Sequence, residues 1–113
     1  MWLDVVIRGE EPSRVRVNTV RFAPGARTAW HKHAVGQTLH VTDGAGRIQS
    51  QGGEVTAIRP GDVIYTPPDE WHWHGAPPDH FMVHTAIWEA PPSDTEPESD
   101  WDEHVTDQEY NAG

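Results

Sequence analysis

Hydrophobic and polar residues alternate in several short stretches of the chain, and this period of two predicts β-strands. Residues 37–42 place Leu39 and Val41 on one face and polar side chains on the other. Residues 14–22 follow the same period at first, but the frame slips near Asn18 and Thr19, as it would at a β-bulge. Further strands are predicted at residues 47–51, 54–58, 62–66 and 80–88.

Glycine and proline separate these stretches. Turns are predicted at Pro24-Gly25, Gly52-Gly53 and Pro60-Gly61, and the segment 44–46 is expected to form a hairpin turn between two paired strands. No stretch of helical periodicity interrupts them. Short strands with regular turns indicate an all-β chain, folded as an antiparallel sandwich or a small barrel.

The composition changes after the last predicted strand. Residues 1–90 are expected to form the barrel, and residues 91–113 an acidic, proline-containing tail that is too poor in apolar residues to fold alone. Thr106 is a candidate N-cap for one helical turn in this tail. Trp101 and Tyr110 are available to pack the tail back onto the barrel.

Composition and charge exclude several classes of partner. The chain has 113 residues, 35% of them apolar, which suffices for one domain with a core. Its formal charge of −10, with Lys32 as the only lysine, disfavours nucleic acids and anionic membrane surfaces. Cysteine is absent, so a metal would have to be bound through nitrogen and oxygen. Without a leader pattern or an apolar span, a cytoplasmic location is the default expectation.

Six of the eight histidines of the chain fall in three pairs: His31 and His33, His72 and His74, and His80 and His84. Residues i and i+2 of a strand point to the same side, so His31 and His33 can present two imidazoles to one point. Gln37 has the same parity, and His72 from a second segment could complete a set of three nitrogens and one oxygen around a metal. His74 shares the face of His72, as a spare ligand or a pocket residue.

The remaining histidines are interpreted individually. His84 lies on the same strand face as Met82 and Ala86 and is therefore expected to point into the barrel. His40 has the opposite parity to Gln37, so an ordinary surface position is expected for it.

These residues resemble the two conserved motifs of the cupins. The segment GARTAWHKHAVGQTLHVTDG resembles the first motif, with Gly25, His31, His33, Gln37 and Gly44 on the motif positions. The segment GDVIYTPPDEWHWH resembles the second motif, with Gly61, Pro67 and His72 in register. The chain departs from the motif at Asp69, where glycine is usual, and at Ala76, where asparagine is usual.

The resemblance covers roughly residues 15–90. It implies a jelly-roll barrel that binds one divalent metal ion per chain, with manganese first and iron, zinc, nickel or cobalt as alternatives. It also implies a homodimer. With glutamine at position 37, where most cupins have glutamate, the chain resembles a subgroup that includes manganese-dependent hydroxynitrile lyases. In that subgroup the resemblance assigns His31, His33, Gln37 and His72 as metal ligands and His74 and His84 as acid-base residues.

The ligand set favours Lewis-acid chemistry on a small-molecule substrate. A neutral amide in place of a carboxylate leaves the charge of the ion uncompensated, so a bound hydroxyl is polarised more strongly. A histidine such as His84 or His74 would then remove the hydroxyl proton, because its pKa lies near working pH. Two alternatives stay open: a dioxygenase that uses iron or manganese with oxygen, and a cupin that binds a small ligand or metal without turnover.

Apolar residues at the start of the chain predict self-association. Val5 and Ile7 lie in what reads as the middle of a first strand, whose uncovered edge favours pairing with a second chain. Trp71 and Trp73 alternate with His72 and His74, so they face away from the site and are expected to pack in the core or at a dimer interface.

Overall fold

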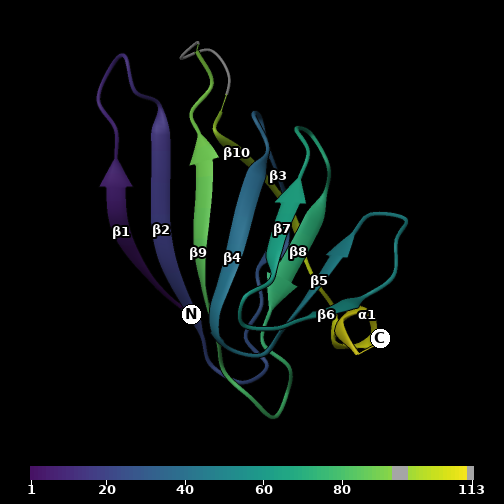
Figure 1. The fold of residues 1–113 in the computed structure, drawn as a ribbon. Helices are drawn as coiled ribbons and strands as arrows, with labels where there is room; N and C mark the ends of the chain where they lie inside the picture. Colours follow the sequence, from purple (N-terminus) through teal and green to yellow (C-terminus); the bar gives the residue numbers. More distant parts are fainter. Residues whose placement is uncertain (93–96, 112–113) are drawn as a thin grey trace.

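Two antiparallel sheets packed face to face make up the fold. The computed structural model describes residues 1–92 and 97–111. Sheet A has the strand order β1-β2-β9-β4-β7 and sheet B the order β10-β3-β8-β5-β6 (Figure 1). The elements are β1 Trp2–Arg8, β2 Val15–Phe22, β3 Ala29–His33, β4 Gln37–Gly44, β5 Gly46–Ser50, β6 Thr56–Ile58, β7 Val63–Thr66, β8 His72–Gly75, β9 Met82–Glu89, β10 Ser99–His104 and α1 Asp107–Tyr110. The prediction of an all-β jelly roll is confirmed.

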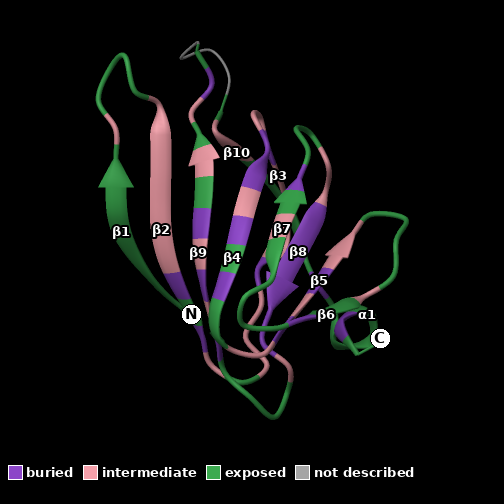
Figure 2. Cartoon of the chain, in the orientation of Figure 1, coloured by how far each residue is buried: buried purple, intermediate pink, exposed green. Residues whose placement is uncertain are grey.

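The apolar core lies between the two sheets. Sheet A contributes Leu39 and Val41 from β4 and Met82 and Ala86 from β9, all buried, and their inward direction follows the predicted alternation. His84 lies between Met82 and Ala86 on the same face of β9 and is fully buried, as expected. Figure 2 shows this alternation of buried and exposed residues along β4.

The expected bulge near Asn18 and Thr19 is wrong. Strand β2 pairs with β9 without interruption from Val15 to Phe22, and the irregularity lies in the neighbouring β1, between Val5 and Ile7. The frame slips because the inward face of β2 changes polarity. Phe22 packs in the core, whereas Asn18, on the same face of the strand, lines the cavity that also contains His31, His33 and Gln37.

The expected hairpin at residues 44–46 is also wrong, because the chain crosses between sheets there. Strand β4 belongs to sheet A and β5 to sheet B, and the two do not pair. Gly44 has φ +78°, and a Cβ at this position would lie 2.1 Å from the Phe81 carbonyl oxygen. The glycine is therefore required by a close backbone approach at the crossing, which a turn pattern alone does not distinguish from a hairpin.

The C-terminal segment contains a strand that the sequence pattern did not predict. Strand β10 pairs with β3 at the edge of sheet B. The predicted helical turn is present: the Thr106 hydroxyl accepts the amide of Glu109, whose carboxylate accepts the amide of Thr106. Tyr110 then packs against Trp73 on the outer face of β8, and both are fully buried.

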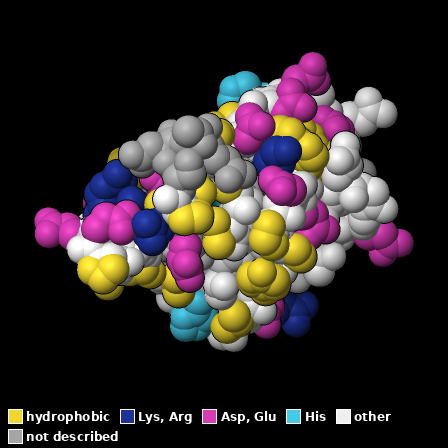
Figure 3. All heavy atoms as spheres, turned by 90° about the horizontal axis from the view of Figure 1, so that it is seen from above, with side chains coloured by type: hydrophobic (Ala, Val, Ile, Leu, Met, Phe, Trp, Pro, Cys, Tyr) yellow, Lys and Arg dark blue, Asp and Glu magenta, His cyan; other side chains and the backbone are white. Residues whose placement is uncertain are grey.

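Strand β1 forms one outer edge of sheet A, and all seven of its residues are exposed (Figure 2). Acidic side chains are spread over the end of the molecule seen in Figure 3, in keeping with the net charge of −10. Within residues 1–92 and 97–111, no helix is long and apolar enough to cross a membrane.

Candidate metal centre and adjoining cavity

Three histidines from sheet B converge between the sheets. His31 and His33 alternate with exposed or half-buried neighbours on β3, and His72 begins β8 directly opposite His31. All three are buried, and one ring nitrogen of each lies within 4.8 Å of the other two. The i, i+2 spacing and the pairing of β3 with β8 together produce this cluster. A metal ion fits such a set of nitrogen donors.

The hydrogen bonds of His31 and His72 leave their Nε2 atoms free for a metal. Nδ1 of His31 lies 2.8 Å from the Ala29 carbonyl oxygen, and Nδ1 of His72 lies 3.1 Å from that of Glu70. A carbonyl only accepts, so both rings carry their proton on Nδ1. This is the arrangement in which metal-binding histidines are commonly held.

Gln37 completes the group from the opposite sheet. It begins β4, it is buried, and its Oε1 lies 3.2 Å from Nε2 of His72. With the proton of His72 on Nδ1, both of these atoms offer lone pairs. A cation shared between them would satisfy both, and adjacent oxygen or nitrogen ligands on an octahedral ion lie about 3 Å apart. The donor set therefore fits a divalent metal ion.

Burial keeps the imidazoles neutral. Desolvation, together with the nearby His72, lowers the pKa of His31 to about 3 and that of His33 to about 4. Desolvation also lowers the pKa of His72, although the Glu70 carbonyl opposes part of this shift. Only the neutral imidazole binds a metal, so the fold holds these rings in their ligating form.

His74 and His84 form a second pair beside the cluster. Nε2 of His84 lies 2.9 Å from Nδ1 of His74, and Phe22 packs against both rings. Their outer nitrogens, Nε2 of His74 and Nδ1 of His84, are buried without a hydrogen-bond partner among the described residues. Desolvation lowers the pKa of His84 to about 4, and desolvation together with the proximity of His84 lowers the pKa of His74 well below its ordinary value.

A cavity of about 190 Å³ connects the two groups of histidines. Its walls are Met1, Leu3, Asn18, Val20, Thr28, His31, His33, Gln37, His74, His84, Ala86, Trp88, Ser99 and Trp101. A larger hollow of about 500 Å³ lies over Trp30, Trp71 and Glu109, and no histidine lines it. The smaller cavity is therefore the one in which a ligand could meet the histidines.

Several wall residues were not identified from the sequence. Ser99 and Trp101 come from β10, and Trp88 from the end of β9. The alternation of β9 does place Trp88 on the face of His84, so parity was the available signal for it. No comparable signal existed for β10, whose sequence is mostly acidic.

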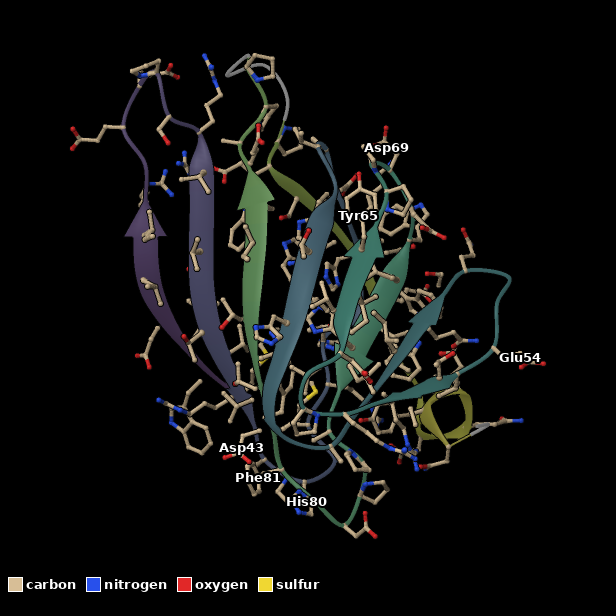
Figure 4. The ribbon with its side chains drawn as sticks, viewed as in Figure 1. Asp43, Glu54, Tyr65, Asp69, His80 and Phe81 are labelled. Atoms are coloured by element: carbon tan, nitrogen blue, oxygen red, sulfur yellow. The ribbon has the colours of Figure 1, made fainter. Side chains whose placement is uncertain are left out.

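The other histidines lie away from this cavity. His40 is exposed on β4, and His104 is exposed on β10. His80 stacks on Phe81 in an exposed loop, far from the loop that carries Asp69 (Figure 4). Tyr65 is exposed on the outer side of sheet A, pointing away from the site (Figure 4).

The proteins that this chain resembles in sequence agree with a match to one family model. Residues 18–88 match the model of the cupin domain. A protein from Granulicella tundricola named (R)-mandelonitrile lyase is 48% identical over 108 residues, which is 96% of this chain and 80% of the relative. A gentisate 1,2-dioxygenase from Aquipseudomonas alcaligenes is 37% identical over 60 residues, which is 53% of this chain and only 17% of that protein.

Solved structures support the same fold. A cupin-like protein from Thermotoga maritima superposes with a TM-score of 0.89 at 38% identity, covering 98% of this chain and 82% of the other. A DMSP lyase from Ruegeria pomeroyi superposes with a TM-score of 0.72 at 18% identity, covering 88% of this chain and 50% of the other, and this likeness concerns the fold alone. The match of residues 18–88 and the relative that is nearly half identical over most of the chain establish the family, as the two sequence motifs indicated: the chain belongs to the cupins.

Proposed function

We propose that this chain is a metal-dependent lyase that cleaves a cyanohydrin to an aldehyde and hydrogen cyanide. The observation that carries the proposal is the buried pair His74 and His84 in the same cavity as the His31, His33 and Gln37 side chains. The (R)-mandelonitrile lyase that is 48% identical supports the choice of reaction. An aryl cyanohydrin is therefore the substrate to test first.

His31, His33, Gln37 and His72 would hold one divalent ion, for which we propose manganese. When bound, the ion supplies Lewis-acid polarisation of the substrate hydroxyl. All four ligands are uncharged, so the protein does not offset the charge of the ion within the site. Iron, zinc, nickel and cobalt are compatible with the same nitrogen and oxygen donors.

The proton chemistry falls to His74 and His84. One of their outer nitrogens accepts the hydroxyl proton of the cyanohydrin as the C–O bond becomes C=O. The bond to the nitrile carbon breaks, and its electron pair leaves with cyanide, which takes up the proton to give hydrogen cyanide. Because burial keeps both imidazoles neutral, the pair can accept this proton.

Aromatic and polar residues shape the rest of the cavity. Trp88 and Trp101 lie on its wall near the ligand histidines: Trp101 stacks on His31 with ring centroids 4.6 Å apart, and Trp88 lies 6.0 Å from His33. These faces offer flat apolar contacts to a small substrate and reduce the access of water. Asn18 adds a hydrogen-bonding side chain to the same wall.

The decisive experiment is a cleavage assay on manganese-loaded protein with an oxygen electrode in the same vessel. Release of benzaldehyde from mandelonitrile without oxygen consumption supports the lyase. Oxygen consumption with iron and an aromatic diol such as gentisate would instead favour a dioxygenase, the activity for which the Aquipseudomonas relative is named. Metal binding with neither activity would leave a binding protein and contradict the proposal.

We also propose that the protein is a homodimer that associates through β1. Five large hydrophobic residues of this strand are exposed: Trp2, Leu3, Val5, Val6 and Ile7. They lie on both faces of the strand, and the outer edge of β1 has no paired strand among the described residues. The β1 strand of a second copy offers the complementary unpaired backbone groups, so a two-fold partner can extend the sheet.

A further inference from the structure

The third ligand histidine is held differently from the other two. Nδ1 of His33 lies 2.9 Å from Oγ of Ser99, a side chain 66 residues away on β10, whereas the Nδ1 atoms of His31 and His72 bond to backbone carbonyls two residues away. A backbone carbonyl cannot be removed by substitution. The bond to Ser99 is therefore the one orientation contact among the three that depends on a side chain.

The free side of the His33 ring faces the cluster. Nε2 of His33 is buried and lacks a hydrogen-bond partner among the described residues, and one nitrogen of the ring lies within 4.8 Å of nitrogens of His31 and His72. A hydroxyl oxygen that accepts the Nδ1 proton leaves the lone pair of Nε2 available to a metal. The contact with Ser99 thus sets the direction of the ring, and in the tautomer protonated at Nδ1 it turns the lone pair of Nε2 toward the cluster.

Ser99 is itself held in place by its neighbours. Glu98 accepts hydrogen bonds from Nε of Arg16 at 3.2 Å and from Nε1 of Trp88 at 3.1 Å. On the other side, Trp101 stacks on His31. The register of β10 places Ser99 directly opposite His33 on β3. The strand segment that carries the hydroxyl is therefore anchored on both sides of Ser99, and such support of a positioning contact favours affinity.

From these contacts we propose that Ser99 is a positioning residue of the metal centre: its hydroxyl accepts the Nδ1 proton of His33 and presents Nε2 of that ring to the metal. The inference rests on the metal site of the proposed function. It assigns a role to β10, a strand that lies outside the two cupin motifs and outside the matched residues 18–88. In this role Ser99 acts on the ion only through the His33 ring.

The test measures the manganese dissociation constant of the full chain, from the electron paramagnetic resonance signal of free Mn²⁺. Ser99→Ala is expected to weaken binding by about 10- to 100-fold, as removal of such an outer contact usually does. Ser99→Thr keeps a hydroxyl and is expected to restore the affinity. Asp100→Ala, on the adjacent exposed position of β10, is the matched control and is expected to bind as the wild type does.

A second measurement reads the protonation of the His33 ring directly in the wild-type protein. In zinc-loaded wild-type protein, long-range ¹H–¹⁵N spectra are expected to show the His33 ring protonated at Nδ1, with its ¹⁵N shifts changed in Ser99→Ala and not in Asp100→Ala. A proton on Nε2 in the wild type, or wild-type manganese affinity in Ser99→Ala, would overturn the role of Ser99 alone. A wild-type chain that binds no metal would overturn the proposed function together with it, and metal binding without cleavage would overturn only the lyase.

Discussion

Nε2 of His84 on sheet A lies 2.9 Å from Nδ1 of His74 on sheet B, so a single hydrogen bond joins the two sheets beside the metal cluster. Neither ring belongs to the group of three histidines that could hold the ion. In the proposed function the pair therefore serves proton transfer, and the ion is held by the neighbouring histidines and Gln37.

His84→Asn is expected to retain the metal and lose turnover by about 10²- to 10⁴-fold, the usual contribution of a positioned acid-base group. The asparagine keeps a polar side chain of similar reach in the buried position. Metal content by elemental mass spectrometry and kcat on mandelonitrile are the two readouts. His40→Asn, on the exposed face of β4, serves as the control. Loss of metal in His84→Asn would make this residue a ligand and contradict the assignment.

His31→Ala and His72→Ala are each expected to abolish metal binding at micromolar concentrations. Each removes one nitrogen donor and leaves a cavity between the sheets, where both side chains are fully buried. Isothermal titration with Mn²⁺ measures the loss, and circular dichroism shows whether the strands persist. His80→Ala, in an exposed loop, is expected to bind as the wild type does. Full occupancy in either cluster variant would show that the ion sits elsewhere.

Gln37→Ala is expected to weaken metal binding less than the histidine substitutions do, because a neutral amide is the weakest donor of the four. Gln37→Glu is expected to bind the ion more tightly and to turn over more slowly, since the carboxylate offsets part of the charge that polarises the substrate hydroxyl. Dissociation constants and kcat for the two variants separate these effects. Faster turnover in Gln37→Glu would argue against the Lewis-acid role of the uncharged site.

The metal-free protein is expected to lose stability as the pH falls below about 6.5. His31, His33 and His84 have pKa values of about 3, 4 and 4 in the folded protein, so between these values and 6.5 the unfolded chain binds protons that the folded chain excludes. Each such histidine lowers the free energy of unfolding by about 2 kcal/mol at pH 5, and nothing is lost above pH 7. These losses are comparable with the total stability of a small domain.

Urea unfolding of the metal-free protein between pH 4 and 8 measures this dependence. The His84→Asn variant, with one titrating group fewer, is expected to show a shallower slope over the same range. A stability that stays constant from pH 7 to pH 5 would mean that the buried histidines take up protons in the folded state, contrary to their burial.

Val5→Lys is expected to convert the proposed dimer to a monomer. It places a charge on the exposed edge strand β1, where desolvation in an interface would be costly, and Val5 is 64% exposed, so the monomer should still fold. Light scattering at micromolar concentration gives the mass. Val63→Lys lies on β7, at the opposite edge of sheet A, with a similar exposure of 65%, and is the matched control. A wild-type chain with monomeric mass would contradict the dimer outright.

The sequence alone predicted the all-β fold class and the shared face of His31 and His33 because both follow from local periods. Alternation on β4 and β9 directs Leu39 and His84 inward, and the i, i+2 spacing of His31 and His33 sets two imidazoles side by side whatever the rest of the chain does. The capping box at Thr106 is equally local, and it formed as expected.

The features that depend on which strands pair with each other were decided by the tertiary structure. The turn residues at 44–46 could not show that β4 and β5 belong to different sheets, since a glycine with positive φ is compatible with a hairpin as well as with a crossing. The acidic β10 has no apolar period of its own and becomes a strand by pairing with β3, which brings Ser99 to His33 and Trp101 to His31. Local patterns thus determined which side chains point inward, whereas long-range strand pairing, which has no local signal, determined what those side chains meet.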